Sequence, residues 1–330
     1  MHLIVDGNNI AWAGLYALGH SIGLETKERR VRAGTVGLTQ SVMGLVARGA
    51  EPPGNSTGRG GLTGLTIVFD EGRPLRRRQI YPAYQTGREA TSSFMDNQPS
   101  VREAIDIFTR GCTFLPCTVL RGTNTEADDL AAAAALADKR MVRIVSSDRD
   151  FLQLVNGRIS IYSPIKRIVV SEGNFVDSCC PRASDGSLVP FPRERYLDFR
   201  AASGDSSDDL PGIPGVGAIT AARLLSKNAL DAYLDDPGLA PRVLERRNVK
   251  LEGAVRSGEA RSIIERNRSL MDLRLAASFF GDLDPYGREG SWHEADFRSW
   301  LVDHRIEMND ARAVITGFER IAQAGSEKPG

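Results

Sequence analysis

Short apolar runs alternate with longer helical stretches over the first 170 residues, and this alternation limits the possible fold most. Residues 2–5, 65–69 and 141–145 have the apolar, β-type composition of strands, whereas residues 31–48 and 130–140 have helical spacing. Strands that alternate with helices build a parallel sheet with helices packed against it. The sequence therefore predicts an α/β fold with a mainly parallel sheet and flanking helices.

The pattern changes in two irregular stretches. Residues 51–64 are rich in Gly, Pro, Ser and Thr and are expected to form a surface loop. Residues 171–192 show neither the apolar spacing of a helix nor the alternation of a strand. From about residue 193 onward the chain is helical in pattern, including residues 218–226. We therefore expect a core over residues 1–192 and a helical region over residues 193–330.

Each of the three predicted strands is followed by an aspartate. Asp6 ends the first strand, Asp70 ends the second, and Asp148 and Asp150 follow the third. The carboxyl ends of parallel strands share one edge of the sheet, where α/β proteins place their ligands. A single aspartate there is explained as a helix N-cap. Three strands that end in the same way predict a cluster of carboxylates.

Two further acidic groups have simple explanations when taken alone. Glu126, Asp128 and Asp129 begin an alanine-rich segment, where acids favour the helix dipole. Asp205 and Asp208 stand in the sequence GDSSDD, which is typical of a solvated turn. Three like charges within one helical turn repel one another more than capping requires, and a bound cation would offset this repulsion. Carboxylates without His or Cys favour Mg²⁺ or Mn²⁺ over zinc.

The remaining residue types exclude several classes of protein. The four histidines lie outside the acidic groups, so neither a zincin-like site nor a Ser/His/Asp triad is supported. An aspartyl phosphatase fits worse, because Asp6 is followed by Gly-Asn-Asn. The four cysteines fit no zinc spacing and no disulfide framework. No signal sequence or membrane segment is found, so we expect a cytoplasmic protein without a membrane partner.

A glycine-rich turn precedes the predicted helix at residues 218–226. Residues 211–217 read PGIPGVG and include Gly212, Gly215 and Gly217. Glycines let the backbone approach a phosphate, and the free amides of a first helical turn bind it without reading base sequence. A purely structural turn needs the same residues. Its position directly after the acids at 205–209 favours the phosphate-binding interpretation.

Five motifs, in order, carry a resemblance to a known superfamily over about residues 1–227. They are VDGNN, VFD with a downstream YxxxR, TEADD, SSDRDFLQL, and AASGDSSDDLPGIPGVGAITAARLL. Together they resemble the flap endonucleases and 5′ nucleases, which include the nuclease domain of bacterial DNA polymerase I and stand-alone phage 5′ exonucleases. The resemblance implies a PIN-like α/β core and a helix-three-turn-helix element. It also implies these metal ligands: Asp6, Asp70, Glu126, Asp128, Asp129, Asp148, Asp150, Asp205 and Asp208.

The resemblance further implies a helical arch over about residues 72–106 that receives the 5′ end of DNA. A basic stretch with aromatic residues suits single-stranded DNA, and we expect DNA contacts from Arg73, Arg76, Arg77, Arg78, Tyr84 and Arg88, and from the three hairpin glycines. The alternative is a solvated helix face. Gln85 stands where many relatives have a lysine that contacts the scissile phosphate, and Asp209 replaces the usual Asn.

These implications predict a divalent-metal-dependent 5′-3′ exonuclease and flap endonuclease. The expected catalytic residues are Arg88, Asp128 and Asp129, the expected cofactors are two Mg²⁺ or Mn²⁺ ions with K⁺ at the glycine hairpin, and the expected substrates are DNA with 5′ ends, flaps or nicks, and RNA primers. Two alternatives stay open. The first is a branched-DNA-binding protein with weakened catalysis, suggested by Gln85, and the second is a PIN-like ribonuclease, which does not need residues 205–217.

The net charge first argues against a nucleic-acid partner. Forty-two Lys and Arg balance forty-two Asp and Glu, whereas nucleic-acid binders are usually basic. Assigning nine acids to one metal site leaves forty-two positive against thirty-three negative charges, or +9 elsewhere. Neutrality is then the average of an acidic pocket and a basic remainder.

Overall fold

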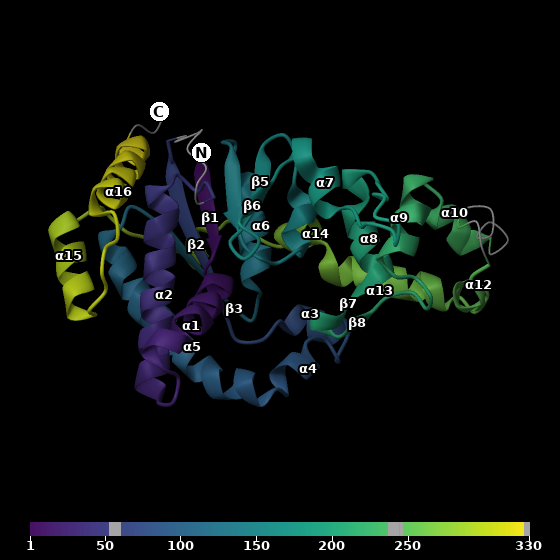
Figure 1. Cartoon of the computed structure of the whole chain (residues 1–330), viewed down its shortest axis with the longest axis horizontal. Helices are drawn as coiled ribbons and strands as arrows, with labels where there is room; N and C mark the ends of the chain where they lie inside the picture. Colours follow the sequence, from purple (N-terminus) through teal and green to yellow (C-terminus); the bar gives the residue numbers. More distant parts are fainter. Residues whose placement is uncertain (53–60, 237–243, 245–246, 327–330) are drawn as a thin grey trace.

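A seven-stranded sheet lies at the centre of the computed structural model, which describes residues 1–52, 61–236, 244 and 247–326. Within these residues the strand order is β6-β5-β4-β1-β2-β3-β9 (Figure 1). The strands are β1 His2–Asp6, β2 Gly64–Glu71, β3 Thr118–Thr123, β4 Val142–Val145, β5 Ile159–Ser163, β6 Ile168–Val170 and β9 Gly287–Glu289. β1 to β5 pair in parallel, and β6 and β9 are antiparallel to their neighbours.

Two apolar cores cover the two faces of this sheet, because side chains along a strand point to alternate faces. Leu3 and Val5 of β1 belong to the core beneath α1 (Gly7–Ile22), α2 (Lys27–Ala47) and α5 (Ser92–Gly111). Ile4 belongs to the opposite core, under α6 (Ala127–Ala137). A strand buried on both faces reads as a continuous apolar run, and this is the pattern of the β1 sequence.

The predicted arch contains two short helices and the first part of a long one, near the carboxyl ends of the strands (Figure 1). α3 (Leu75–Ile80) and α4 (Thr86–Glu89) follow β2, and α5 then runs back to β3. Figure 1 shows α3, α4 and the start of α5 beyond the end of β1 where α1 begins. This arrangement closes one side of the space at the carboxyl edge of the sheet.

The second half of the chain is mainly helical, as predicted. Its elements are α7 Phe175–Cys179, α8 Tyr196–Ser203, β7 Gly204–Asp205, β8 Leu210–Pro211, α9 Ala218–Ser226, α10 Leu230–Asp235, α12 Val249–Arg256, α13 Glu259–Met271, α14 Leu273–Ala277, α15 Glu294–Asp303 and α16 Ala311–Ser326. β9 then pairs with β3, and α16 packs against α2. The boundary at residue 192 stays a prediction, because this last segment lies on the sheet and helices of residues 1–192.

The fold class predicted from the sequence is confirmed, with differences in detail. The predicted strands correspond to β1, β2 and β4, and the predicted helices to α2, α6 and α9. The stretch over residues 171–192 is less irregular than expected, because it contains α7. The loop predicted over residues 51–64 falls largely outside the described residues. None of the helices in the described ranges is long and apolar enough to cross a membrane.

Candidate metal centre

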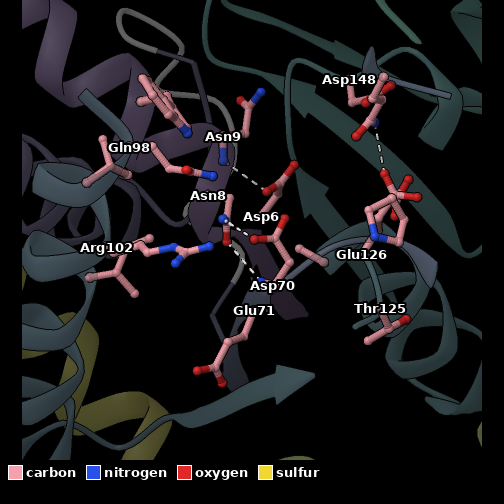
Figure 2. Close-up of a pocket in the computed structure, with 18 of the residues that line it drawn as sticks. Asp6, Asn8, Asn9, Asp70, Glu71, Gln98, Arg102, Thr125, Glu126 and Asp148 are labelled. Carbon is pink, nitrogen blue, oxygen red and sulfur yellow. Dashed lines mark hydrogen bonds between the residues drawn. The ribbon is translucent and has the colours of Figure 1, made fainter. Parts of the chain in front are cut away.

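A cavity of about 300 Å³ lies at the carboxyl edge of the sheet (Figure 2). Six of the nine predicted ligands line it, namely Asp6, Asp70, Glu126, Asp128, Asp148 and Asp208. Gln98 and Arg102 of α5 line the side formed by the arch. The structure therefore brings together acids from two strand ends, the start of α6, the segment after β4 and the turn after β7.

Two asparagines in the first turn of α1 fix the two strand ends. The Asn8 side chain donates to Asp70 Oδ1 at 2.6 Å and accepts from the Asp70 amide at 3.0 Å. Asp6 caps α1 by accepting from the Asn9 amide at 3.0 Å, and its other oxygen accepts from the Ser146 hydroxyl at 2.7 Å. The sequence reasoning missed these supporting roles, although the motif VDGNN contained the signal.

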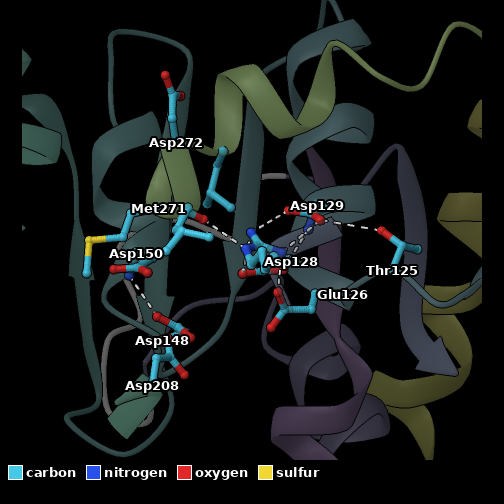
Figure 3. Close-up of polar contacts among 12 residues, drawn as sticks. Thr125, Glu126, Asp128, Asp129, Asp148, Asp150, Asp208, Met271 and Asp272 are labelled. Carbon is cyan, nitrogen blue, oxygen red and sulfur yellow. Dashed lines mark hydrogen bonds and ion pairs between the residues drawn. The ribbon is translucent and has the colours of Figure 1, made fainter. Parts of the chain in front are cut away.

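Arg77 binds the acids at the start of α6. Its side chain is 2% exposed and donates to the two Asp129 oxygens at 2.9 and 2.7 Å. It also pairs with Glu126, and its Nη2 lies 3.9 Å from Asp128 Oδ2. Nε donates to the Leu270 carbonyl at 2.8 Å. A guanidinium thus lies among three of the predicted ligands, which Figure 3 shows gathered at this point.

Arg200 of α8 pairs with a second group of acids, Asp150 and Asp205, as Arg77 does with the first. It is 5% exposed, donates to Asp150 Oδ1 at 2.8 Å, and pairs with Asp205. The other oxygen of Asp205 accepts from the Ser207 amide at 2.9 Å and from its hydroxyl at 2.5 Å. The sequence reasoning did not single out Arg200, because nothing in its local pattern separates it from a surface arginine.

Gln85 bridges the two acidic groups. Its amide nitrogen donates to Glu126 at 3.0 Å and to Asp208 at 2.8 Å. The Tyr84 hydroxyl, on a side chain that is only 4% exposed, lies 3.3 Å from the same glutamate. Gln85 has a left-handed backbone with a φ of 57°. The residue that replaces the expected lysine is therefore directed at the carboxylates.

The arginines predicted to contact DNA occupy different environments. Arg73 is exposed, whereas Arg76 and Arg78 are half-buried, and Arg76 stacks over Phe279 with 4.9 Å from Cζ to the ring centroid. Arg77 does not reach the surface, since the acids enclose it. Arg88 belongs to α4, but its side chain lies outside the part of the chain that the structure describes. Their DNA contacts stay predictions.

The glycine hairpin leads directly into α9. β7 and β8 form a short antiparallel pair in which Gly204 faces Pro211. Gly212 lies against the backbone of Ser203, where a Cβ would clash, and Gly215 has a φ of +80°, which favours glycine. Gly217 is the N-cap of α9 and supplies no side-chain oxygen to the first-turn amides. This end of α9 has the backbone form expected of a phosphate site.

Comparisons with known proteins show the family of this chain. Residues 1–178 match the model of the family described as "5′-3′ exonuclease, N-terminal resolvase-like domain". The chain belongs to this 5′-3′ exonuclease family. The predicted resemblance to flap endonucleases and 5′ nucleases is therefore confirmed.

Relatives of this exonuclease family member include much longer proteins. DNA polymerase I of Mycobacterium tuberculosis is 32% identical over 275 residues, which are 82% of this chain and 27% of that protein. The thermostable DNA polymerase I of Thermus thermophilus is 31% identical over 229 residues, which are 68% of this chain and 24% of that protein. The chain thus spans about a quarter of the length of these curated relatives.

Solved structures share the fold of the exonuclease family member. The T5 5′-exonuclease with bound divalent zinc has a TM-score of 0.58 at 17% identity, over 92% of this chain and 98% of that chain. Human GEN1 in complex with Holliday junction DNA has a TM-score of 0.56 at 12% identity, over 98% of this chain and 72% of that chain. At these identities the likeness establishes the fold alone.

Burial makes several acids of this site hard to ionise. It raises the pKa of Glu126 to about 7, because the neighbouring acids add to the effect and only Arg77 opposes it. Burial likewise raises the pKa of Asp150 to about 6, with Asp148 as the next cause. The pKa of Asp128 is also raised. A divalent cation would stabilise the ionised forms.

We expect metal to stabilise the protein more at pH 8 than at pH 5.5. A carboxyl whose pKa is higher in the folded than in the unfolded state contributes stability below its unfolded pKa and loses it as the pH rises through the folded value. For Glu126 this window runs from about 4.5 to 7, and its loss is roughly 3 kcal/mol. Thermal unfolding in EDTA and in Mg²⁺ at both pH values tests this. An equal or larger gain at pH 5.5 would contradict it.

Proposed function

We propose that this chain is a divalent-metal-dependent 5′ nuclease that hydrolyses DNA phosphodiesters as a 5′-3′ exonuclease and flap endonuclease. The observation that carries the proposal is the convergence of six carboxylates on one cavity beneath the arch. Family membership supports it, and so do proteins with the same fold, among them a T5 flap endonuclease in a complex with DNA and metal ions.

The donor set fits Mg²⁺ or Mn²⁺. The carboxylates that line the cavity offer hard oxygen ligands, and no His or Cys lies among the described residues that line it. When bound, such an ion supplies positive charge to the phosphoryl oxygens and favours ionisation of water. Residues that would hold it include Asp6, Asp70, Asp128, Asp148 and Asp208. Two divalent ions, and K⁺ at the hairpin, belong to the same proposal.

The protein's own side chains have separate tasks in this proposal. Asn8 and Ser146 orient Asp70 and Asp6, so that these carboxylates are in place before a substrate arrives. Arg102 lies across the cavity, where its charge can hold a phosphate. The free amides of α9 would bind the duplex backbone without reading base sequence. DNA with 5′ ends, flaps or nicks, and RNA primers, are the proposed substrates.

A 5′-labelled flap duplex tests the function in single-turnover reactions. We expect short labelled products in Mg²⁺ and none in EDTA, because without metal the acidic cavity repels the phosphate. Failure to release products in both Mg²⁺ and Mn²⁺ would contradict the nuclease proposal. A labelled single-stranded RNA of the same sequence is the control for specificity. Preferential cleavage of the RNA would favour a PIN-like ribonuclease.

One observation supports the alternative of a branched-DNA-binding protein with weakened catalysis. Gln85 carries no charge, and its side-chain amide donates hydrogen bonds to Glu126 and Asp208. It therefore supplies no positive charge to a bound phosphate. Binding in Ca²⁺ is expected for either function and does not separate them. The single-turnover cleavage rate separates the two functions. The alternative predicts that the protein binds the flap but cleaves it in Mg²⁺ hardly faster than in EDTA.

A further inference from the structure

The nine acids assigned to the metal site fall into two sets. Six line the cavity, and the described lining of that cavity does not include Asp129, Asp150 or Asp205. These three side chains are at least nine-tenths buried. All three pair with an arginine that is itself more than nine-tenths buried. Of the six acids that line the cavity, Glu126 also pairs with Arg77, and Asp128 lies 3.9 Å from it. The three remaining acids are therefore set apart by two features together: they pair with a buried arginine and they do not line the cavity.

Arg77 occupies the oxygens of Asp129. One Asp129 oxygen accepts from Nη2 at 2.7 Å, and the other accepts from Nη1 at 2.9 Å and from the Thr125 hydroxyl at 3.4 Å. This forked geometry is the one in which a guanidinium binds a carboxylate most strongly. A divalent ion at Asp129 would have to displace these donors and deprive a buried guanidinium of the carboxylate that binds it in a fork, which is costly.

Arg200 occupies the second group in the same way. One oxygen of Asp205 pairs with the guanidinium, and the other accepts two hydrogen bonds from Ser207. Asp150 gives Oδ1 to Nε of the same arginine at 2.8 Å. The oxygens of Asp150, Asp205 and Asp208 lie within 4.8 Å of one another, a spacing that suits a cation. The cation present at the first two of these acids is Arg200.

We infer that Arg77 and Arg200 are resident cations of this site, that Asp129, Asp150 and Asp205 bind these arginines instead of metal, and that the metal ligands are the six acids lining the cavity. The inference rests on the proposed function, whose metal site it narrows. A guanidinium stays charged at any physiological pH. It can therefore hold the acids together before metal or DNA arrives.

The two arginines also join the site to the regions proposed to grip DNA. Arg77 lies on α3, at the base of the arch, and its Nε bonds to Leu270 at the end of α13. Arg200 lies on α8 and holds Asp205, the first acid of the β7–β8 turn. Both therefore act as positioning residues: they orient the cavity-lining acids through the elements that carry them.

Counting bound Mn²⁺ ions by electron paramagnetic resonance tests the inference on the full chain without DNA. We expect Asp150→Asn and Asp205→Asn to bind as many ions as wild type, with affinity lowered by about 10- to 100-fold. Asp148→Asn and Asp208→Asn are the matched controls from the same two segments, and we expect each to lose an ion. One ion fewer in Asp150→Asn or Asp205→Asn would overturn the inference.

Substitution of the arginine gives the converse result. Arg200→Met leaves Asp150 and Asp205 without their cation, within 4.8 Å of an oxygen of Asp208, so we expect it to bind one Mn²⁺ more than wild type. Arg200→Lys keeps a cation and should bind the wild-type number, which a purely structural role of Arg200 would not explain. A folded Arg200→Met protein that binds the same number of Mn²⁺ ions as wild type would overturn the inference. Lack of flap cleavage by wild type would instead count against the nuclease and leave these ion counts unaffected.

Discussion

Asp128→Asn is expected to lower the single-turnover rate of flap cleavage by roughly a thousand-fold, or about 4 kcal/mol of barrier. Asp128 lines the cavity and follows the first residue of α6, where its Oδ1 accepts from the Asp129 amide at 2.8 Å. The amide of an asparagine is nearly the same size, so the helix start should remain folded. It removes one negative charge from the metal-binding set, and this is the change that should reduce the rate.

The matched control is Asp177→Asn on α7. Asp177 is exposed and does not line the cavity, so its substitution should leave the cleavage rate within about two-fold, as usual for surface positions. Binding of the flap duplex in Ca²⁺ and the unfolding temperature show whether Asp128→Asn is folded. A folded Asp128→Asn protein that cleaves at the wild-type rate would contradict the assignment of this acid to the metal set.

Arg77→Met is expected to destabilise the metal-free protein by about 3–5 kcal/mol at pH 8, because it leaves buried carboxylates without their counter-charge. Arg77 is 2% exposed and pairs with Glu126 and Asp129. Urea unfolding in EDTA measures the change as a lower midpoint. The loss should shrink at pH 5.5, because burial raises the pKa of Glu126 to about 7 and its protonation removes one uncompensated charge.

An exposed ion pair of the same chain is the control for this experiment. Arg298 donates to Glu294 at 2.8 Å, and both side chains are at least 40% exposed, so Arg298→Met should cost about 1 kcal/mol at most. The double variant Arg77→Met with Asp129→Leu should recover part of the loss, since it also removes one of the buried carboxylates that Arg77 compensates. If Arg77→Met lowers the free energy of unfolding no more than Arg298→Met does, the buried acids tolerate the loss of their partner and the prediction is wrong.

The sequence predicts the strand ends of the site well, for a physical reason. A buried parallel strand is a local pattern, and its carboxyl end must lie at the ligand-binding edge. Asp6 and Asp70 could therefore be placed from residues near them in the chain, and the structure brings them to the same cavity. The acids at 126–129 were singled out by like charges at short spacing, whereas Asp205 and Asp208 were assigned only through the family resemblance.

The partners of these acids could not be predicted from local patterns. Arg77 lies 52 residues from Asp129 in the chain, and Arg200 lies 50 residues from Asp150. In the sequence Arg77 is one of three consecutive arginines and resembles its neighbours. Only the packing of α3 against the site decides which of the three becomes buried. The position of β9 in the sheet could not be predicted either, because a strand of three residues carries almost no periodicity.

The late return of β9 to the sheet has a consequence for how the chain folds. β9 pairs with β3, and the Thr118 hydroxyl donates to Glu289 across 171 residues of sequence. Until that segment has been synthesised and has docked, β3 presents an open edge to other chains, and unpaired edges invite aggregation. The acidic cavity and its arginines are synthesised earlier. The site can therefore assemble while its sheet is unfinished, and closing the sheet edge is expected to be a late, slow step of folding.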